Sequence, residues 1–151
     1  MKQLTELMKQ NRFFGNLPDK YLQLIASFGK ISDLSEDSFL AREGTEADQF
    51  YVVLSGKLAI NIFHPTNGDI TVQTIGKGEL LGWSWLFPPH MWAFNIKTLK
   101  PCQVIAFDGN KVRELCDQDH ELGYLFMREF AGVMTARLKA TRMQLLDIYG
   151  N

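Results

Sequence analysis

The 151-residue sequence has few cysteines, no concentrated run of basic residues and no long apolar stretch. Its only two cysteines, Cys102 and Cys116, lack the spacing of a metal site or a redox pair, so we interpret both as buried thiols. No stretch approaches the roughly 20 apolar residues that span a bilayer, and the chain does not start with an apolar segment of signal-peptide length. We therefore expect a cytoplasmic protein that does not enter a membrane.

The charge pattern excludes further classes of function. The formal net charge is −1 and the basic residues are scattered, whereas nucleic-acid binding needs a concentrated basic face. The three histidines lie in unrelated segments, and the sequence contains neither an HExxH-like spacing nor a Walker loop. We expect neither direct nucleic-acid binding nor an enzyme, while a local pocket for a small anionic ligand remains compatible with these data.

The composition itself is that of an ordinary globular protein, with 46% hydrophobic and 22% charged residues. A chain of this length can bury a core of its own. We expect one domain over residues 1–151, divided into helices at 1–28, a β region at 29–108 and further helices at 110–149.

In the first region, apolar residues recur at helical intervals and are interrupted at "GNLPD". This pattern predicts two short helices. Pro18 suits the first turn of the second helix, and Asn16 or Asp19 could cap its start.

The middle region changes to short apolar runs such as "FYVVLSG" and "CQVIAFD", separated by turn signals. Asn67-Gly68 is a candidate for a tight hairpin. Short strands with frequent turns predict a mainly β fold, an antiparallel sandwich or barrel, rather than alternating strands and helices.

The third region predicts a short helix in "NKVRELCDQD" and a long helix over 119–149, with Asp119 as its cap. Apolar residues follow the long helix at spacings near 3.6. The helix would be about 45 Å long, more than a small barrel can cover, so we expect a homodimer through it. The alternative is that the helix folds back on its own barrel.

The stretch "LAREGTEADQFYVVLSGKLAI" resembles the cyclic-nucleotide-binding domain of the catabolite activator and Fnr superfamily. The matching residues are Gly44, Ala47, residues 50–53 and Gly56. Both glycines stand where a barrel needs tight corners, since glycine accepts a positive φ. The resemblance covers nearly the whole chain and implies a double-stranded β-helix, or jelly-roll barrel, with N-terminal helices and a long C-terminal dimerisation helix.

In this family, transcription regulators carry a helix-turn-helix domain after the long helix. No such segment follows Tyr149 in the sequence. From this difference we expect a stand-alone sensory module rather than a direct DNA-binding protein.

The family's phosphate-binding cassette begins with Gly-Glu and ends with Arg, a small residue and Ala. Gly78-Glu79 matches its beginning. In the family, the glutamate accepts a hydrogen bond from the ribose 2′-hydroxyl, and N–H groups of a following short helix hold the phosphate. "LLGWSWLF" could supply that helix, so the resemblance makes Gly78, Glu79, Leu80 and Leu81 candidate ligand residues.

The cassette arginine is absent. Between Glu79 and Thr98 only His90 and Lys97 are basic, and Met91 or a neighbour stands about where the arginine would be expected. Neither a thioether nor a mostly neutral imidazole replaces a bidentate guanidinium. His90 and Met91 complete the candidate set, and we expect binding of cAMP or cGMP to be weak, altered or lost. Lys97 is expected on the following strand, with its orientation open.

Aromatic side chains replace the missing charge: Trp83, Trp85, Phe87, Trp92 and Phe94. They could pack in the core or line an altered pocket. Two hypotheses follow. The first is a regulatory module without a cofactor that binds a cyclic nucleotide or another small anion. The second is a non-binding scaffold for a protein partner.

Overall fold

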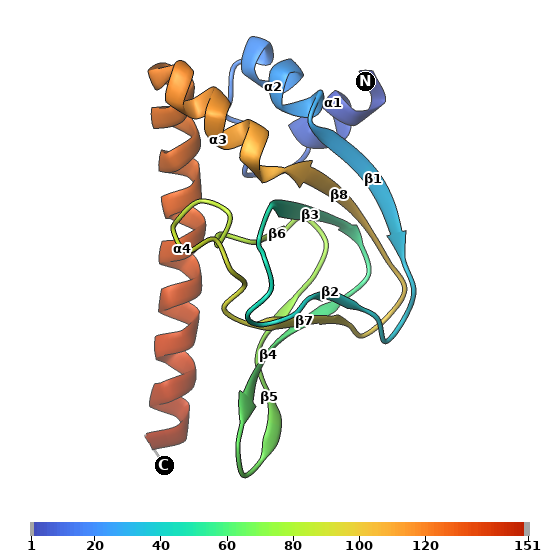
Figure 1. The fold of residues 1–151 in the computed structure, drawn as a ribbon, viewed down its shortest axis with the longest axis vertical. Coiled ribbons are helices and arrows are strands. Elements are labelled where there is room, and N and C mark those ends of the chain that lie inside the picture. The colour runs from blue at the N-terminus through green and yellow to red at the C-terminus, as the bar shows by residue number, and fades with distance from the viewer. Residues whose placement is uncertain (1, 150–151) are drawn as a thin grey trace.

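A computed structural model describes residues 2–149, so residues 1, 150 and 151 of the predicted domain lie outside the described part. The described residues form two antiparallel four-stranded sheets with flanking helices (Figure 1). The order of the first sheet is β1 (Gly29–Leu34), β8 (Cys102–Asp108), β3 (Gln49–Ser55) and β6 (Leu80–Leu81). The order of the second is β2 (Phe39–Ala41), β7 (Asn95–Thr98), β4 (Leu58–His64) and β5 (Gly68–Ile75). The predicted mainly β jelly-roll architecture is confirmed.

Two hydrophobic cores lie on the two faces of the first sheet. Along β3, alternate side chains point to opposite faces, as the strand period requires. Phe50 and Val52 join the core shared with the helices, whereas Tyr51 and Val53 join the core between the sheets. Because both faces of this strand are buried, its sequence is a continuous apolar run.

The N-terminal region contains the two predicted helices, α1 (Lys2–Lys9) and α2 (Asp19–Ala26). Pro18 directly precedes α2 and no side chain caps the helix. The prediction of a polar cap was wrong, because both candidate side chains point elsewhere. The Asn16 amide donates to Glu129, and Asp19 pairs with Lys9.

The C-terminal region consists of α3 (Gly109–Gln118) and α4 (His120–Tyr149). The predicted cap is confirmed, since the Asp119 carboxylate accepts from the Leu122 N–H at 3.1 Å. Leu122, Phe126 and Phe130 of α4 are buried. Beyond Phe130 the described part of the helix has no fully buried residue, although it continues along one side of the sheets (Figure 1).

The predicted hairpin at Asn67-Gly68 joins β4 to β5. His64 lies opposite Gly68, so the connection has three residues and is longer than a two-residue turn. Gly68 takes a φ of +72°. The hairpin is therefore confirmed with a different turn.

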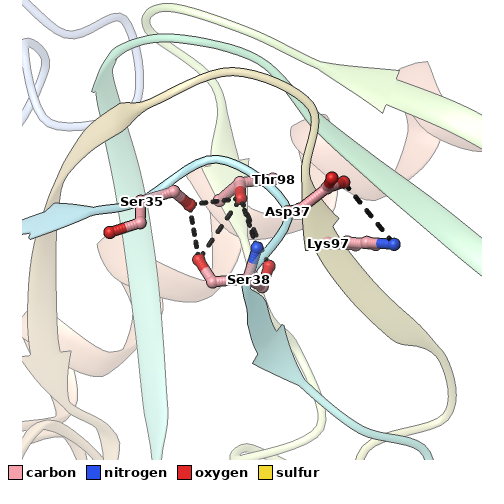
Figure 2. Close-up of polar contacts among 5 residues, drawn as sticks. All are labelled: Ser35, Asp37, Ser38, Lys97 and Thr98. Carbon is pink, nitrogen blue, oxygen red and sulfur yellow. Dashed lines mark hydrogen bonds and ion pairs between the residues drawn. The ribbon is translucent and has the colours of Figure 1, made fainter.

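Lys97 lies on β7, as expected, and its side chain reaches the corner between β1 and β2 (Figure 2). Its ammonium is 3.6 Å from the Asp37 carboxylate. Next to it, the Thr98 hydroxyl donates to the Ser35 carbonyl at 2.6 Å and accepts from the Ser38 N–H at 2.9 Å. The Thr98 hydrogen bonds hold the corner in place. Lys97 forms a surface ion pair with Asp37.

Candidate functional site

The turn between β5 and β6 carries the first two candidate residues, Gly78 and Glu79. Gly78 takes a φ of +86°, which favours glycine. The Gly78 N–H donates to Val53 at 2.8 Å, and the Val53 N–H donates to the Glu79 carbonyl at 3.0 Å. From the other side, the buried Asn11 amide donates to the Gly78 carbonyl at 2.6 Å. The turn is therefore held between β3 and the N-terminal segment.

The Glu79 side chain is exposed at this turn. Its carboxylate accepts from the Gly76 N–H at 3.2 Å, which occupies one of its two oxygens. A carboxylate has several acceptor positions, so Glu79 can still accept a hydrogen bond from a ligand hydroxyl.

A groove of about 470 Å³ lies beside Glu79, between the turn and α4. This volume is within the range of small-molecule pockets. On the side opposite α4, the groove is lined by the N-terminal segment, with Arg12 and Phe13, and by the barrel, with Gln73, Ile75, Gly78, Glu79 and Leu80. On the α4 side, it is lined by Glu129, Gly132, Val133, Ala136, Arg137 and Ala140, whose spacing places them on one face of the helix.

Small residues on α4 keep the groove open. A Cβ atom built on Gly132 would meet nothing within 4 Å. Ala136 and Ala140 follow at successive helical turns and also line the groove.

Arg137 is the partly buried cation of the groove. Burial lowers the pKa of its guanidinium, and the Glu79 carboxylate partly offsets that shift. The structure thus brings a cation from α4 into the electrostatic range of Glu79, although the two residues are far apart in the sequence.

The next two candidate residues, Leu80 and Leu81, form β6, and their side chains point to opposite faces of the sheet. Leu80 is 3% exposed and Leu81 is fully buried. Leu80 packs in the core shared with the helices and also lines the groove, whereas Leu81 packs in the core between the sheets.

The segment after β6 forms turns where a short helix was expected. The Leu86 N–H donates to Trp83 at 3.0 Å, and the Trp85 indole donates to the Gly82 carbonyl at 3.0 Å. The buried Ser84 hydroxyl has no hydrogen-bond partner among the described residues. The prediction of a cassette helix was therefore wrong, and the segment lacks that helix's row of N–H groups.

His90 and Met91 lie at the end of this segment and do not line the groove beside Glu79. The His90 carbonyl accepts from the Ala47 N–H at 2.7 Å, and Met91 forms an isolated bridge with Glu46. Arg113 of α3 is 3.3 Å from the His90 Nδ1 and also donates to the Trp85 carbonyl. Arg113 thus fastens the segment to α3. The ligand roles of His90 and Met91 stay predictions.

The tryptophans occupy the cores and do not fill the groove. Trp85 is fully buried and stacks on Phe50 at 4.8 Å between ring centroids. Trp92 is 6% exposed and stacks on Tyr51 at 6.4 Å, in the core between the sheets. Trp83 is partly buried against Phe94. Core packing therefore accounts for most of the aromatic cluster.

Sequence reasoning did not identify Arg12, Glu129 or Arg137 as site residues. One pattern could have pointed to α4: small residues recur every four positions at Gly132, Ala136 and Ala140. Such a series opens space on one helix face, and Arg137 lies on the same face.

The fold and the groove define a small jelly-roll domain with a ligand-sized groove against its last helix. The family model of the cyclic nucleotide-binding domain matches residues 32–119, more than half of the chain. The chain belongs to this family, and the resemblance found in the sequence is confirmed.

Curated relatives are named as regulators. The chain is 23% identical over 127 residues to the anaerobic regulatory protein of Bacillus subtilis strain 168, covering 83% of this chain and 52% of that protein. It is also 23% identical over 106 residues to the CRP-like cAMP-activated global transcriptional regulator of Mycobacterium tuberculosis strain CDC 1551 / Oshkosh, covering 70% and 46%. The chain spans about half the length of the curated relatives that it matches.

Solved structures share the fold. A Geobacter metallireducens GS-15 protein assigned to the cyclic nucleotide-binding proteins has a TM-score of 0.80 at 27% identity, covering 89% of this chain and 97% of that chain. The regulatory domain of Toxoplasma gondii PKA, solved with cAMP, has a TM-score of 0.63 at 21% identity, covering 72% and 41%. Within residues 2–149, we find no helix with the length and apolar character needed to cross a membrane.

Proposed function

We propose that the chain is a regulatory ligand-binding module, with its ligand in the groove between the β5–β6 turn and α4. The main support for this proposal is that residues of the β5–β6 turn and residues of α4 line the same groove. A ligand that prefers one placement of α4 would shift the population of that placement. Family membership and the regulatory relatives support the same function.

The ligand class that we propose is a cyclic nucleotide or a related small anion, bound without a cofactor. Gly78 and Glu79 are held at the groove, and Leu80 contributes to its wall. Because the 82–92 segment has no arginine, we expect cAMP and cGMP to bind at least about tenfold more weakly than in a site with that residue.

Calorimetry with cAMP and cGMP tests this proposal. We expect weak, saturable heat from the wild-type chain. Glu79→Gln should reduce it, because the change removes the charge but keeps an oxygen that can accept from Gly76. Glu36→Gln, at an exposed position away from the groove, is the matched control.

Met91→Arg tests where the ligand lies. Met91 is 45% exposed and does not line the groove, so an arginine there should not raise nucleotide affinity. A gain in affinity would extend the site to the 82–92 segment and would support the ligand roles of His90 and Met91.

The second candidate function is a protein-interaction scaffold that dimerises through α4. It is favoured by the exposed apolar side chains on the second half of that helix, which include Leu138, Leu146 and Ile148. Absence of binding at millimolar cAMP and cGMP would favour the scaffold over the sensor. In both cases we propose a cytoplasmic, non-enzymatic protein without direct contact to nucleic acid.

A further inference from the structure

The groove beside Glu79 contains two ionisable side chains of each sign, and their contacts differ. The Glu79 carboxylate accepts from the Gly76 N–H at 3.2 Å, and the Glu129 carboxylate accepts from the Asn16 amide at 3.4 Å. Among the described residues, neither the Arg12 guanidinium nor the Arg137 guanidinium has a hydrogen-bond acceptor or an ion-pair partner within 4 Å. The groove therefore has guanidinium donors for which residues 2–149 supply no acceptor.

Arg137 is the stronger of the two candidates because part of its hydration is lost. Its side chain is partly buried, whereas Arg12 is exposed. A guanidinium that leaves water without an acceptor raises the free energy of the folded state. Burial also lowers the pKa of the Arg137 guanidinium below its ordinary value, which agrees with the loss of hydration.

The shape of the groove limits what can satisfy these donors. A guanidinium presents a planar fork that matches two oxygens of a phosphate. Phe13, Ile75 and Val133 provide an apolar wall, and Glu79 offers an acceptor for a hydroxyl group. Phosphate, hydroxyl and an apolar planar surface occur together in nucleotides, and the groove of about 470 Å³ has a suitable size.

We propose that Arg137 of α4, assisted by Arg12, binds the phosphate group of the ligand. The long helix then supplies the cation that the 82–92 segment lacks. One bound phosphate would connect α4 to the N-terminal segment, and a hydroxyl of the same ligand would contact Glu79. Ligand binding would thereby hold α4 against the barrel.

This inference rests on the proposed groove, but its test does not require nucleotide binding. Inorganic phosphate is titrated into the full chain at constant ionic strength, with chloride as the exchanged anion, and amide resonances are followed by NMR. We expect saturable shifts at Gly78, Glu79 and Gly132, which line the groove. Arg137→Gln should weaken the apparent phosphate affinity by at least about tenfold.

Two further variants complete the test. Arg142→Gln removes an exposed arginine of α4 that does not line the groove, and it should leave phosphate binding unchanged. Gly132→Leu should abolish it, because a large side chain would enter the open space while leucine favours the helix. This variant serves as the second test if Arg137→Gln fails to fold.

A wild-type chain without groove shifts would overturn the proposal, as would equal shifts in the wild type and Arg137→Gln. Nucleotide calorimetry then separates this proposal from the proposed function. If cAMP and adenosine bind equally well to the wild type, the groove binds a ligand but Arg137 does not hold its phosphate. If phosphate binds through Arg137 and nucleotides do not bind, the anion site stands and the cyclic-nucleotide class is wrong.

Discussion

At the residue scale, two glycines at barrel corners differ in whether a side chain would fit. Both have a positive φ, but only one has free space at its Cα atom. Gly44 and Gly56 have φ values of +84° and +98°. A Cβ atom at Gly44 would meet nothing within 4 Å, whereas one at Gly56 would lie 2.5 Å from the Cys102 sulfur and 2.6 Å from the Pro101 carbonyl. Position 44 therefore favours glycine only because of its positive φ. Position 56 favours glycine because of its positive φ and also because no space is left for a side chain.

This difference predicts unequal costs for alanine. Gly44→Ala should lower the free energy of unfolding by about 1 kcal/mol, the cost of a left-handed alanine. Gly56→Ala should lower it by about 3 kcal/mol, because the clash adds to that cost. Urea denaturation measures both, and equal losses would contradict this explanation.

Tyr21 links the N-terminal helices to the start of α4. Its hydroxyl donates to Asp119 at 3.3 Å and to Glu121 at 3.2 Å. Burial, with the nearby carboxylates Asp119 and Glu121, raises the pKa of Tyr21 to about 12 from the ordinary 10.0. Burial and Asp48 likewise raise the pKa of Tyr51 to about 12. The folded chain therefore retains these protons at a pH where the unfolded chain loses them.

The raised pKa of Tyr21 makes the free energy of unfolding depend on pH. The stabilisation from the raised pKa is fully present below pH 10 and is lost as the pH rises towards 12. Tyr21→Phe should make the fall in unfolding free energy between these pH values less steep. Urea denaturation across this range is the measurement, with Tyr124→Phe as control because Tyr124 is 64% exposed. A fall that is equally steep in Tyr21→Phe would exclude the proposed contribution.

At the element scale, α4 changes its environment along its length. Its first half buries Leu122, Phe126 and Phe130, whereas farther along Leu138 is 72% and Ile148 is 70% exposed. Exposed apolar surface on this scale is typical of an interface between proteins. We propose that a second copy of the chain covers it.

The double variant Leu138→Glu with Ile148→Glu should convert the dimer into a monomer, because it places charges on the proposed apolar interface. Sedimentation equilibrium measures the change. Lys139→Gln with Arg142→Gln alters exposed polar positions of the same helix and should leave the dimer intact. A wild-type chain that is monomeric at high concentration would exclude this interface.

Most elements could be predicted because their causes are local. Helical spacing indicated the long helix, and Asp119 could be identified as its cap because the helix has apolar periodicity from there on. The segment after Leu81 could not be predicted from local preference. Trp85 turns into the core and its indole bonds to Gly82, and this tertiary packing replaces the expected short helix with turns.

At the scale of the whole molecule, the candidate site depends on contacts between distant parts of the chain. The sequence indicated Gly78 and Glu79 but gave no reason to place Arg137 next to them. That proximity arises because Phe126 and Phe130 pack on the core and set the path of α4 across the β5–β6 turn. A motif within one segment could not contain this information.

We propose that one ligand contacts both the β5–β6 turn and α4. The most direct measurement is an NMR titration of the full chain with cAMP up to millimolar concentration. We predict weak, saturable shifts at Gly78 and Glu79 together with Gly132 and Arg137. Shifts confined to other regions, or no shifts at millimolar cAMP, would contradict the claim.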